Sequence, residues 1–224
     1  MRRIFLGFSI ISVLALLLIL LETSCRKKIN NDLIVSGIVI DTTTGAPIEG
    51  AVISISRSEI SSGTYSSGYE FVTSANSDAN GNFCIETEKN RSVSFLMTAF
   101  KDQYISNEVY FTSGDIDPYG NHLEIVMLSP VAFLNLRFKN THPYNSSDFF
   151  SYGFGQESPV CADCCPPGPV VFTGNNVDQT ISCTVFGNRT NIVYYKVVKN
   201  DVTHFFEDSI VCPAFSTIDH LIEY

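Results

Sequence analysis

The chain has 224 residues and carries 23 acidic against 14 basic side chains, which gives a formal net charge of −9. This balance argues against nucleic acid as a partner, because binding phosphates requires basic patches. The chain has no tryptophan but 17 phenylalanines and 10 tyrosines, and no stretch after residue 25 keeps a helical apolar period. Composition and pattern therefore predict an all-β protein.

The N-terminal segment has the pattern of an export signal. Met1–Arg3 is basic, Ile4–Leu21 is almost unbroken apolar sequence, and small residues precede Cys25. The segment resembles the signal of bacterial lipoproteins, in which this cysteine becomes the new, acylated N-terminus. The resemblance implies a signal peptide at residues 1–24 and a lipid anchor on Cys25.

Two other interpretations of this segment stay open. Glu22 stands where the lipoprotein motif has an aliphatic residue, and the apolar run is long enough for an uncleaved membrane helix. An ordinary cleaved signal is the third possibility. All three export the body of the chain, and the preferred lipoprotein interpretation also anchors it. We therefore predict a location at the bacterial cell envelope, membrane-anchored and facing the periplasm or the exterior. Residues 25–33 are then a lipidated tether, with Arg26–Lys28 against anionic headgroups.

Short strand patterns separated by turn residues follow the tether and are typical of a β-sandwich. Within Ala51–Arg57, for example, isoleucines and serines alternate as in a half-buried strand. The Ser/Gly-rich stretch Ser58–Gly68 is predicted to be a loop. The strands are predicted at Leu33–Ile40, Ala51–Arg57, Tyr69–Ala75, Asn82–Glu86, Ser92–Phe100, Ile105–Phe111 and Leu123–Leu128.

Residues 34–130 carry three motifs of a known domain in the same order. They are Val35–Asp41, Thr44–Val52 and Ser77–Phe83. With them this region resembles the carboxypeptidase regulatory-like domain, a transthyretin-like β-sandwich, and the resemblance implies an accessory module without catalytic residues of its own. Gly45 and Gly81 suit turn positions with unusual dihedral angles, and Phe83 is predicted to lie in the core.

A second, cysteine-containing β-sandwich is predicted for residues 131–224, after a boundary at Ser129-Pro130. Ala132–Phe138 alternates as a strand, whereas Asn140–Asp178 has little strand pattern and is predicted to be a long pinned loop. The remaining strands are predicted at Thr180–Phe186, Asn191–Val198, Thr203–Phe206, Ser209–Cys212 and Thr217–Tyr224.

Six cysteines follow the lipidation candidate, and an even number in an exported chain indicates disulfides. They are Cys84, Cys161, Cys164, Cys165, Cys183 and Cys212. Cys183 and Cys212 share faces with apolar residues, so we predict that they point inward and pair. Cys84 is predicted to pair with one of the cysteines at 161–165 and so to join the two domains.

Metal and redox chemistry are the alternatives for the Cys-x-x-Cys sequence at Cys161 and Cys164. A zinc site needs a second pair of ligands, which the neighbouring sequence lacks. A redox-active pair normally opens a helix, which Pro166 and Pro167 prevent. We therefore predict structural disulfides, no metal site and no cofactor.

Two His-x-x-Glu sequences, at His204–Glu207 and His220–Glu223, match the spacing of zinc-peptidase ligands. On a strand, however, residues three apart face opposite sides, so the sequence predicts no peptidase site. The acidic and amide side chains of Asp78–Asn82 resemble part of a calcium loop, but the glycine position favours a β-turn.

Four aromatic residues lie close together in the predicted long loop: Phe149, Phe150, Tyr152 and Phe154. Exposed rings would bind a sugar or a protein, whereas buried rings would only anchor the loop. The sequence thus predicts a non-catalytic structural or protein-binding module, with carbohydrate binding through residues 149–154 as the alternative and an uncharacterised hydrolase as a third hypothesis. The expected partners are the membrane, through the lipid, and an envelope protein or glycan.

Overall fold

The computed structural model describes residues 32–61, 64–65, 68–89, 92–155, 159, 161–166 and 168–224. In these residues the backbone forms β-strands and the turns between them, so the predicted all-β class is confirmed. The described residues contain no helix that is long and apolar enough to cross a bilayer. The predicted signal peptide, Cys25 and most of the tether lie outside this part of the chain.

The chain separates into two compact units. Unit 1 comprises the described part of Met1–Ile40 with Ala46–Ala99 and Asn107–Val126, and unit 2 comprises Asp41–Gly45, Phe100–Ser106 and Met127–Tyr224. Strand β9 (Asn121–Lys139) contributes its first residues to unit 1 and the others to unit 2.

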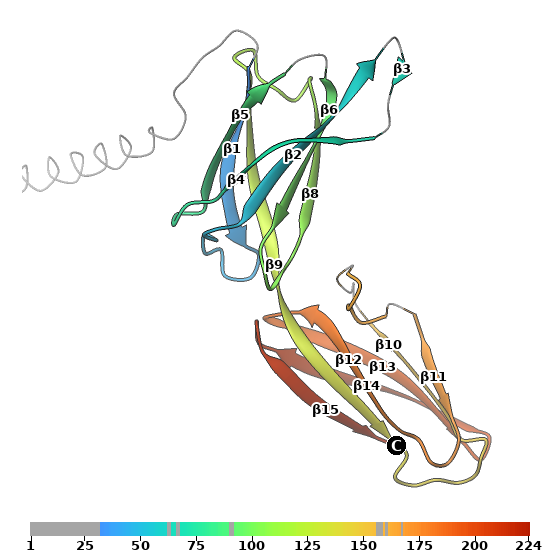
Figure 1. The fold of residues 1–224 in the computed structure, drawn as a ribbon. Helices are drawn as coiled ribbons and strands as arrows, with labels where there is room; N and C mark the ends of the chain where they lie inside the picture. Colours follow the sequence, from blue (N-terminus) through green and yellow to red (C-terminus); the bar gives the residue numbers. More distant parts are fainter. Residues whose placement is uncertain are drawn as a thin grey trace, which may run out of the picture. The chain divides into compact units, whose positions relative to one another are not determined.

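Unit 1 is built from two sheets (Figure 1). In one sheet β1 (Asp32–Asp41) lies between β5 (Asn82–Glu88) and β9, and Val35 of β1 stands opposite Ile85 of β5. The other sheet has the order β3-β2-β6-β8, and β4 also pairs with β2. Its strands are β2 (Val52–Ser61), β3 (Thr64–Tyr65), β4 (Glu70–Asn76), β6 (Ser92–Phe100) and β8 (Asn107–Thr112).

The interior of unit 1 follows the predicted alternation of apolar residues. Ile53 and Ile55 of β2 are buried, and so are Phe83 and Ile85 of β5. Each large apolar side chain removed from water stabilises the fold by roughly 1.5–3 kcal/mol. Phe95 of β6 adds an aromatic contact by stacking on Phe111, with 5.0 Å between the ring centroids.

A tight turn precedes β5 and confirms the turn prediction at Asp78. The Asp78 carboxylate accepts hydrogen bonds from the backbone N–H groups of Asn80 (2.9 Å) and Asn82 (2.8 Å). Gly81 has a φ of +76°, and a Cβ there would lie 2.6 Å from the carbonyl oxygen of Val39. The turn therefore requires glycine for its backbone angle and for the close approach of β1.

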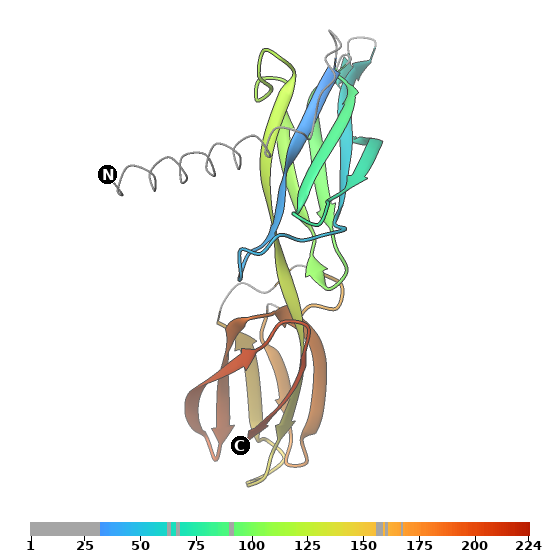
Figure 2. The ribbon, with the colours of Figure 1, turned by 90° about the vertical axis from the view of Figure 1, so that its left-hand side faces the viewer.

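Unit 2 also has two sheets, which can be followed by colour in Figures 1 and 2. In the first, β9 lies between β12, which is antiparallel to it, and β15, which is parallel; short β7 also pairs with β9. The second has the order β11-β10-β13-β14. The strands are β7 (Tyr104–Ile105), β10 (Phe149–Phe154), β11 (Val170–Thr173), β12 (Asp178–Phe186), β13 (Arg189–Lys199), β14 (Val202–Cys212) and β15 (Thr217–Glu223).

The core of unit 2 is dominated by aromatic rings. The Phe138 ring centroid lies 4.4 Å from that of Tyr152 and 5.0 Å from that of Phe150, and all three side chains are buried. Tyr224, at the end of the chain, stacks on Phe150 with 4.5 Å between the centroids. Edge and offset contacts of this kind add about 0.5–1.5 kcal/mol per pair to the burial of the rings.

Two predicted loops contain strands, and the strands predicted on either side of Ser129-Pro130 are one continuous strand. β9 continues through Ser129 and Pro130 without a break. Pro130 has no N–H to leave unpaired, and its carbonyl oxygen accepts a hydrogen bond from the N–H of Gly187 (2.7 Å). The predicted long loop contains β10 and β11, and the predicted loop at Ser58–Gly68 contains the end of β2 and strand β3.

Candidate binding surface

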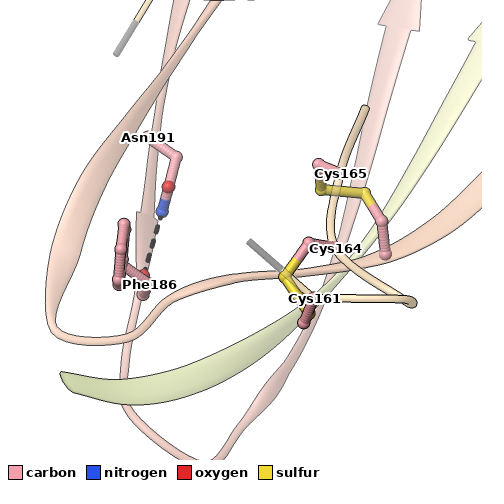
Figure 3. The surroundings of a disulfide bond; sticks show 6 residues. Cys161, Cys164, Cys165, Phe186 and Asn191 are labelled. Atoms are coloured by element: carbon pink, nitrogen blue, oxygen red, sulfur yellow. Dashed lines mark hydrogen bonds between the residues drawn. A yellow bond between two sulfur atoms is a disulfide. The ribbon is translucent and has the colours of Figure 1, made fainter. Parts of the chain in front are cut away.

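The cysteine cluster of unit 2 forms two disulfides, Cys161–Cys164 and Cys165–Cys183 (Figure 3). The segment before β11 runs beside β12: the N–H of Cys165 donates to the carbonyl of Thr184 (3.1 Å), and the N–H of Thr184 donates to the carbonyl of Asp163 (2.8 Å). This backbone pairing brings Cys165 next to Cys183. The cluster is therefore structural and pins the segment between β10 and β11 to the first sheet.

The predicted Cys183–Cys212 disulfide is wrong, although both side chains point inward as expected. Cys212 is a buried free thiol on β14, which belongs to the sheet that faces β12. Burial raises its pKa, and a hydrogen bond with the Asn191 side chain opposes that rise. Asn191 also donates to the carbonyl of Phe186 (Figure 3).

The predicted disulfide between Cys84 and the cluster is also wrong. Cys161, Cys164 and Cys165 all pair inside unit 2. Cys84 itself is disulfide-bonded and half-buried on β5, on the face opposite Phe83, as the alternation predicted.

The four aromatic residues, interpreted from sequence either as an exposed binding loop or as buried anchors of a loop, lie on strand β10. Phe150 and Tyr152 face the core and are almost completely buried, so they cannot contact a ligand. Phe154 is partly buried and packs against the same core. Only Phe149 faces outward, and the amino group of Lys196 lies over its ring at 5.4 Å from the centroid. Strand alternation thus corrects the carbohydrate-binding prediction for most of this set.

The most exposed apolar side chains of unit 2 lie on β14. This strand follows β13 through a two-residue turn in which Asn200 and Asp201 both have positive φ (49° and 61°). Such a turn suits the right-handed twist of a β-hairpin. In the described part of the chain, β14 forms a backbone ladder with β13 alone, so its other edge lies open.

Every side chain in the first half of β14, from Val202 to Glu207, is exposed. Phe205 is 77% exposed and Phe206 is 45% exposed, and they point to opposite faces of the sheet. Phe206 faces inward and stacks on Tyr195, with 5.1 Å between the ring centroids. We call Val202–Glu207 the β14 edge; it offers unpaired backbone groups together with apolar side chains on both faces.

The outer face of the same sheet extends the apolar character of the β14 edge. Phe205 stands opposite Lys196 of β13, and Tyr194 stands opposite Glu207. The Tyr194 ring lies against the backbone of Gly155, because a Cβ at that glycine would meet the ring at 2.0 Å. The outer face therefore carries the rings of Phe205 and Tyr194, with Lys196 and Glu207 beside them.

The two His-x-x-Glu sequences both lie on strands, as predicted. His204 and Glu207 are exposed on β14, and their side chains point to opposite faces. His220 of β15 instead binds Asp208 of β14, with 2.8 Å between Nε2 and Oδ2. In the described residues no three His, Cys, Asp or Glu side chains come together as metal ligands.

Sequence reasoning missed Phe205, Phe206 and Tyr194 as surface residues. The adjacent phenylalanines in a strand were the available signal, because neighbours in a strand cannot both be buried under one sheet. The edge position of β14 had no sequence signal, since strand order depends on the whole fold.

Comparisons with known proteins show no family for this chain. No family model and no curated protein sequence matches it. Among solved structures it is similar to 3-chlorocatechol 1,2-dioxygenase from Rhodococcus opacus 1CP (16% identity, TM-score 0.35, 48% of this chain and 62% of that one). It is also similar to the Bacillus anthracis TIE protein (13% identity, TM-score 0.36, 87% of this chain and 34% of that one). A third similar structure is the streptococcal ancillary pilin (13% identity, TM-score 0.34, 87% of this chain and 63% of that one). The chain spans less than two thirds of each.

Proposed function

We propose that this protein is a non-catalytic binding module of the bacterial cell envelope, held to a membrane by its N-terminus, that binds another envelope protein through the β14 edge. The exposure of Phe205 at an open strand edge is the observation that carries the proposal. Natural proteins usually cover or charge such edges, because unpaired N–H and C=O groups pair readily with another chain.

The proposed partner contributes an extended segment with apolar and basic residues. Strand addition would satisfy the free backbone groups of β14, and side chains of the added strand would contact Phe205 on one face and Phe206 on the other. Glu207 is exposed beside them, Asp201 is exposed in the preceding turn, and the whole chain is acidic. A basic partner therefore gains attraction as well as apolar contact.

Site-specific cross-linking tests this proposal. A photo-reactive amino acid replaces Phe205 in the full-length chain in its native envelope, and a matched chain carries it at Phe71, an exposed phenylalanine of unit 1. We expect the Phe205 probe to capture one protein through an extended, basic segment, and the Phe71 probe not to capture it.

A binding measurement with that purified partner provides the second half of the test. Replacing Phe205 with Glu should weaken the complex at least about tenfold, which corresponds to roughly 1.4 kcal/mol. Replacing Phe71 with Glu should leave it unchanged. Equal binding by both variants would show that the β14 edge is not the contact.

Carbohydrate binding is the second candidate function, on a different set of residues from those the sequence suggested. The rings of Tyr194 and Phe205 are exposed on one face of the sheet, where sugars stack on flat aromatic surfaces. Glycan-array binding that disappears with Tyr194→Ala, in a protein that shows no β14 cross-link, would favour this function over the first.

A further inference from the structure

Unit 1 carries a row of exposed apolar side chains on the first part of β9. Leu123 is 78% exposed and Ile125 is 57% exposed, and they share one face because they are two residues apart on a strand. His122 and Val126 point to the opposite face and are buried. The apolar row, Leu123 and Ile125, therefore lies on the outer face of the sheet that β9 forms with β1 and β5.

The outer face of this sheet changes in character from one strand to the next. β1 lies in the middle and contributes the half-buried Ile34 and Ile38. β5 contributes Glu86 and Glu88, which are exposed, and Glu86 stands opposite Ile34. The β9 side of the face is thus apolar and the β5 side is acidic, so a surface that covers the first must leave the second in water.

The turn before β9 presents another exposed ring. Tyr119 is 69% exposed. The Asp117 carboxylate fixes this turn by accepting hydrogen bonds from the backbone N–H groups of Tyr119 (2.8 Å) and Asn121 (2.7 Å). Tyrosine combines an apolar ring with a polar hydroxyl and is enriched where lipid meets water. A tyrosine just before an exposed apolar row is therefore typical of a surface that contacts lipid.

The described chain begins at the same end of unit 1. The N–H of Ile34 donates to the carbonyl of Gly120 (2.8 Å), and a Cβ at Gly120 would meet the carbonyl oxygen of Asp32. Leu123 follows Gly120 by three residues, which is about 10 Å of strand. The start of β1 thus lies close to both Tyr119 and the apolar row.

The length of the tether limits how far this end of unit 1 can lie from a membrane. Only Arg26–Asn31 separates Asp32 from Cys25, the proposed attachment point. A stretch of this length spans at most about 25 Å when fully extended. Such a short connection gives even a weak apolar surface a high effective concentration of lipid. The bilayer is therefore the apolar surface that the row meets most often.

We propose that the apolar row and Tyr119 lie on the surface of the membrane that holds the chain. This inference rests on the membrane attachment proposed above, and it adds an orientation: the β9 side of the sheet faces the bilayer and the β5 side faces water. The lipid that fits is a zwitterionic phospholipid, because Glu86, Glu88 and Asp117 would be repelled by anionic headgroups.

A single tryptophan at position 123 tests the proposal, because the natural chain has none. The full-length chain is reconstituted into phosphatidylcholine vesicles. For Leu123→Trp we expect a blue-shifted emission that falls by about half or more when the acyl chains are brominated, as for a ring at the headgroup–acyl boundary. Phe71→Trp, at an exposed position of the other sheet of unit 1, should show neither effect.

A second reporter tests whether the apolar row holds this face on the lipid. Tyr119→Trp should be quenched by brominated lipid in the same way. Adding Leu123→Glu and Ile125→Glu to that variant should remove the quenching, because two charges would have to enter the interface. Adding Phe71→Glu instead should leave the quenching unchanged. All of these positions are exposed, so the fold should tolerate the changes.

Three results would overturn the inference, and flotation of the vesicles separates them. If the chain floats with the vesicles but the probes at 123 and 71 are quenched equally, the attachment stands and the row does not contact lipid. A blue shift that grows with protein concentration, without quenching by brominated lipid, would show that a second copy covers the row. A chain that does not float would contradict the membrane attachment itself, and this inference with it.

Discussion

Units 1 and 2 are both built from two sheets, but their interiors are held together differently. The buried side chains of unit 1 are mainly aliphatic, with few rings, and its described turns rely on local carboxylate and glycine chemistry. Unit 2 has an aromatic core, two disulfides, and both buried carboxylates of the described residues, Asp41 and Asp148. The comparison teaches that clear alternation specifies the strands of unit 1, whereas the weakly patterned Asn140–Asp178 segment of unit 2 is held by disulfides and aromatic contacts.

The largest expected effect is the loss of a core ring in unit 2. Phe138→Ala removes the side chain at the centre of the aromatic cluster and should lower the free energy of unfolding by about 3–5 kcal/mol. Hydrogen exchange followed by mass spectrometry should show the loss of protection in β10 and β13. Phe95→Ala is the matched change in unit 1 and should affect β2 and β6 instead. Equal loss in both units from either change would mean that they unfold together.

Removal of the two disulfides within unit 2 should give the next largest effect. Replacing Cys165 and Cys183 with Ala opens a link between residues 18 apart and should destabilise unit 2 by roughly 3 kcal/mol. Replacing Cys161 and Cys164, which are 3 apart, should cost only roughly 2 kcal/mol. Urea unfolding of the two double variants measures this order, and the reverse order would contradict the pinning role of Cys165–Cys183.

Acid should destabilise unit 2 through the buried carboxylate of Asp41. Burial raises the pKa of Asp41, but hydrogen bonds from Thr43, Thr44 and Tyr104 outweigh it and lower the pKa overall. A lowered folded pKa gives stability that is complete above the unfolded value of about 4 and is lost as pH falls through the folded value. Thermal unfolding between neutral and acidic pH should show this loss, on the order of 1 kcal/mol. Asp41→Asn should reduce the acid sensitivity, and an unchanged pH profile would exclude Asp41 as its source.

The smallest expected effect comes from the hydroxyl of Tyr152. Burial raises its pKa to about 12, and the hydroxyl has no hydrogen-bond partner among the described residues. Tyr152→Phe should therefore leave the free energy of unfolding unchanged or raise it by up to about 1 kcal/mol, because an unpaired polar group leaves the core. Calorimetry measures the change, and a clear destabilisation would reveal a partner for the hydroxyl.

The accuracy of the sequence predictions differs between the same two units. In unit 1 the predicted faces of Ile53, Phe83 and Cys84 are confirmed, and so is the turn at Asp78. In unit 2 the inward direction of Cys183 is confirmed, but its partner was predicted incorrectly. The aromatic residues of β10 were also predicted only in part. The sequence grouped Phe149 with Phe150, but the two side chains point to opposite faces of the strand.

The sequence by itself determined the β class, the alternation of faces along each strand and the chemistry of the tight turns. These features depend on backbone geometry over two to four residues, so neighbouring side chains are sufficient to specify them. Only the tertiary structure decided that Cys165 reaches Cys183, that β14 lies at an edge, and that Gly120 meets the start of β1. Each of these pairings joins residues distant in the chain, and packing of the whole sandwich sets the strand order that brings them together.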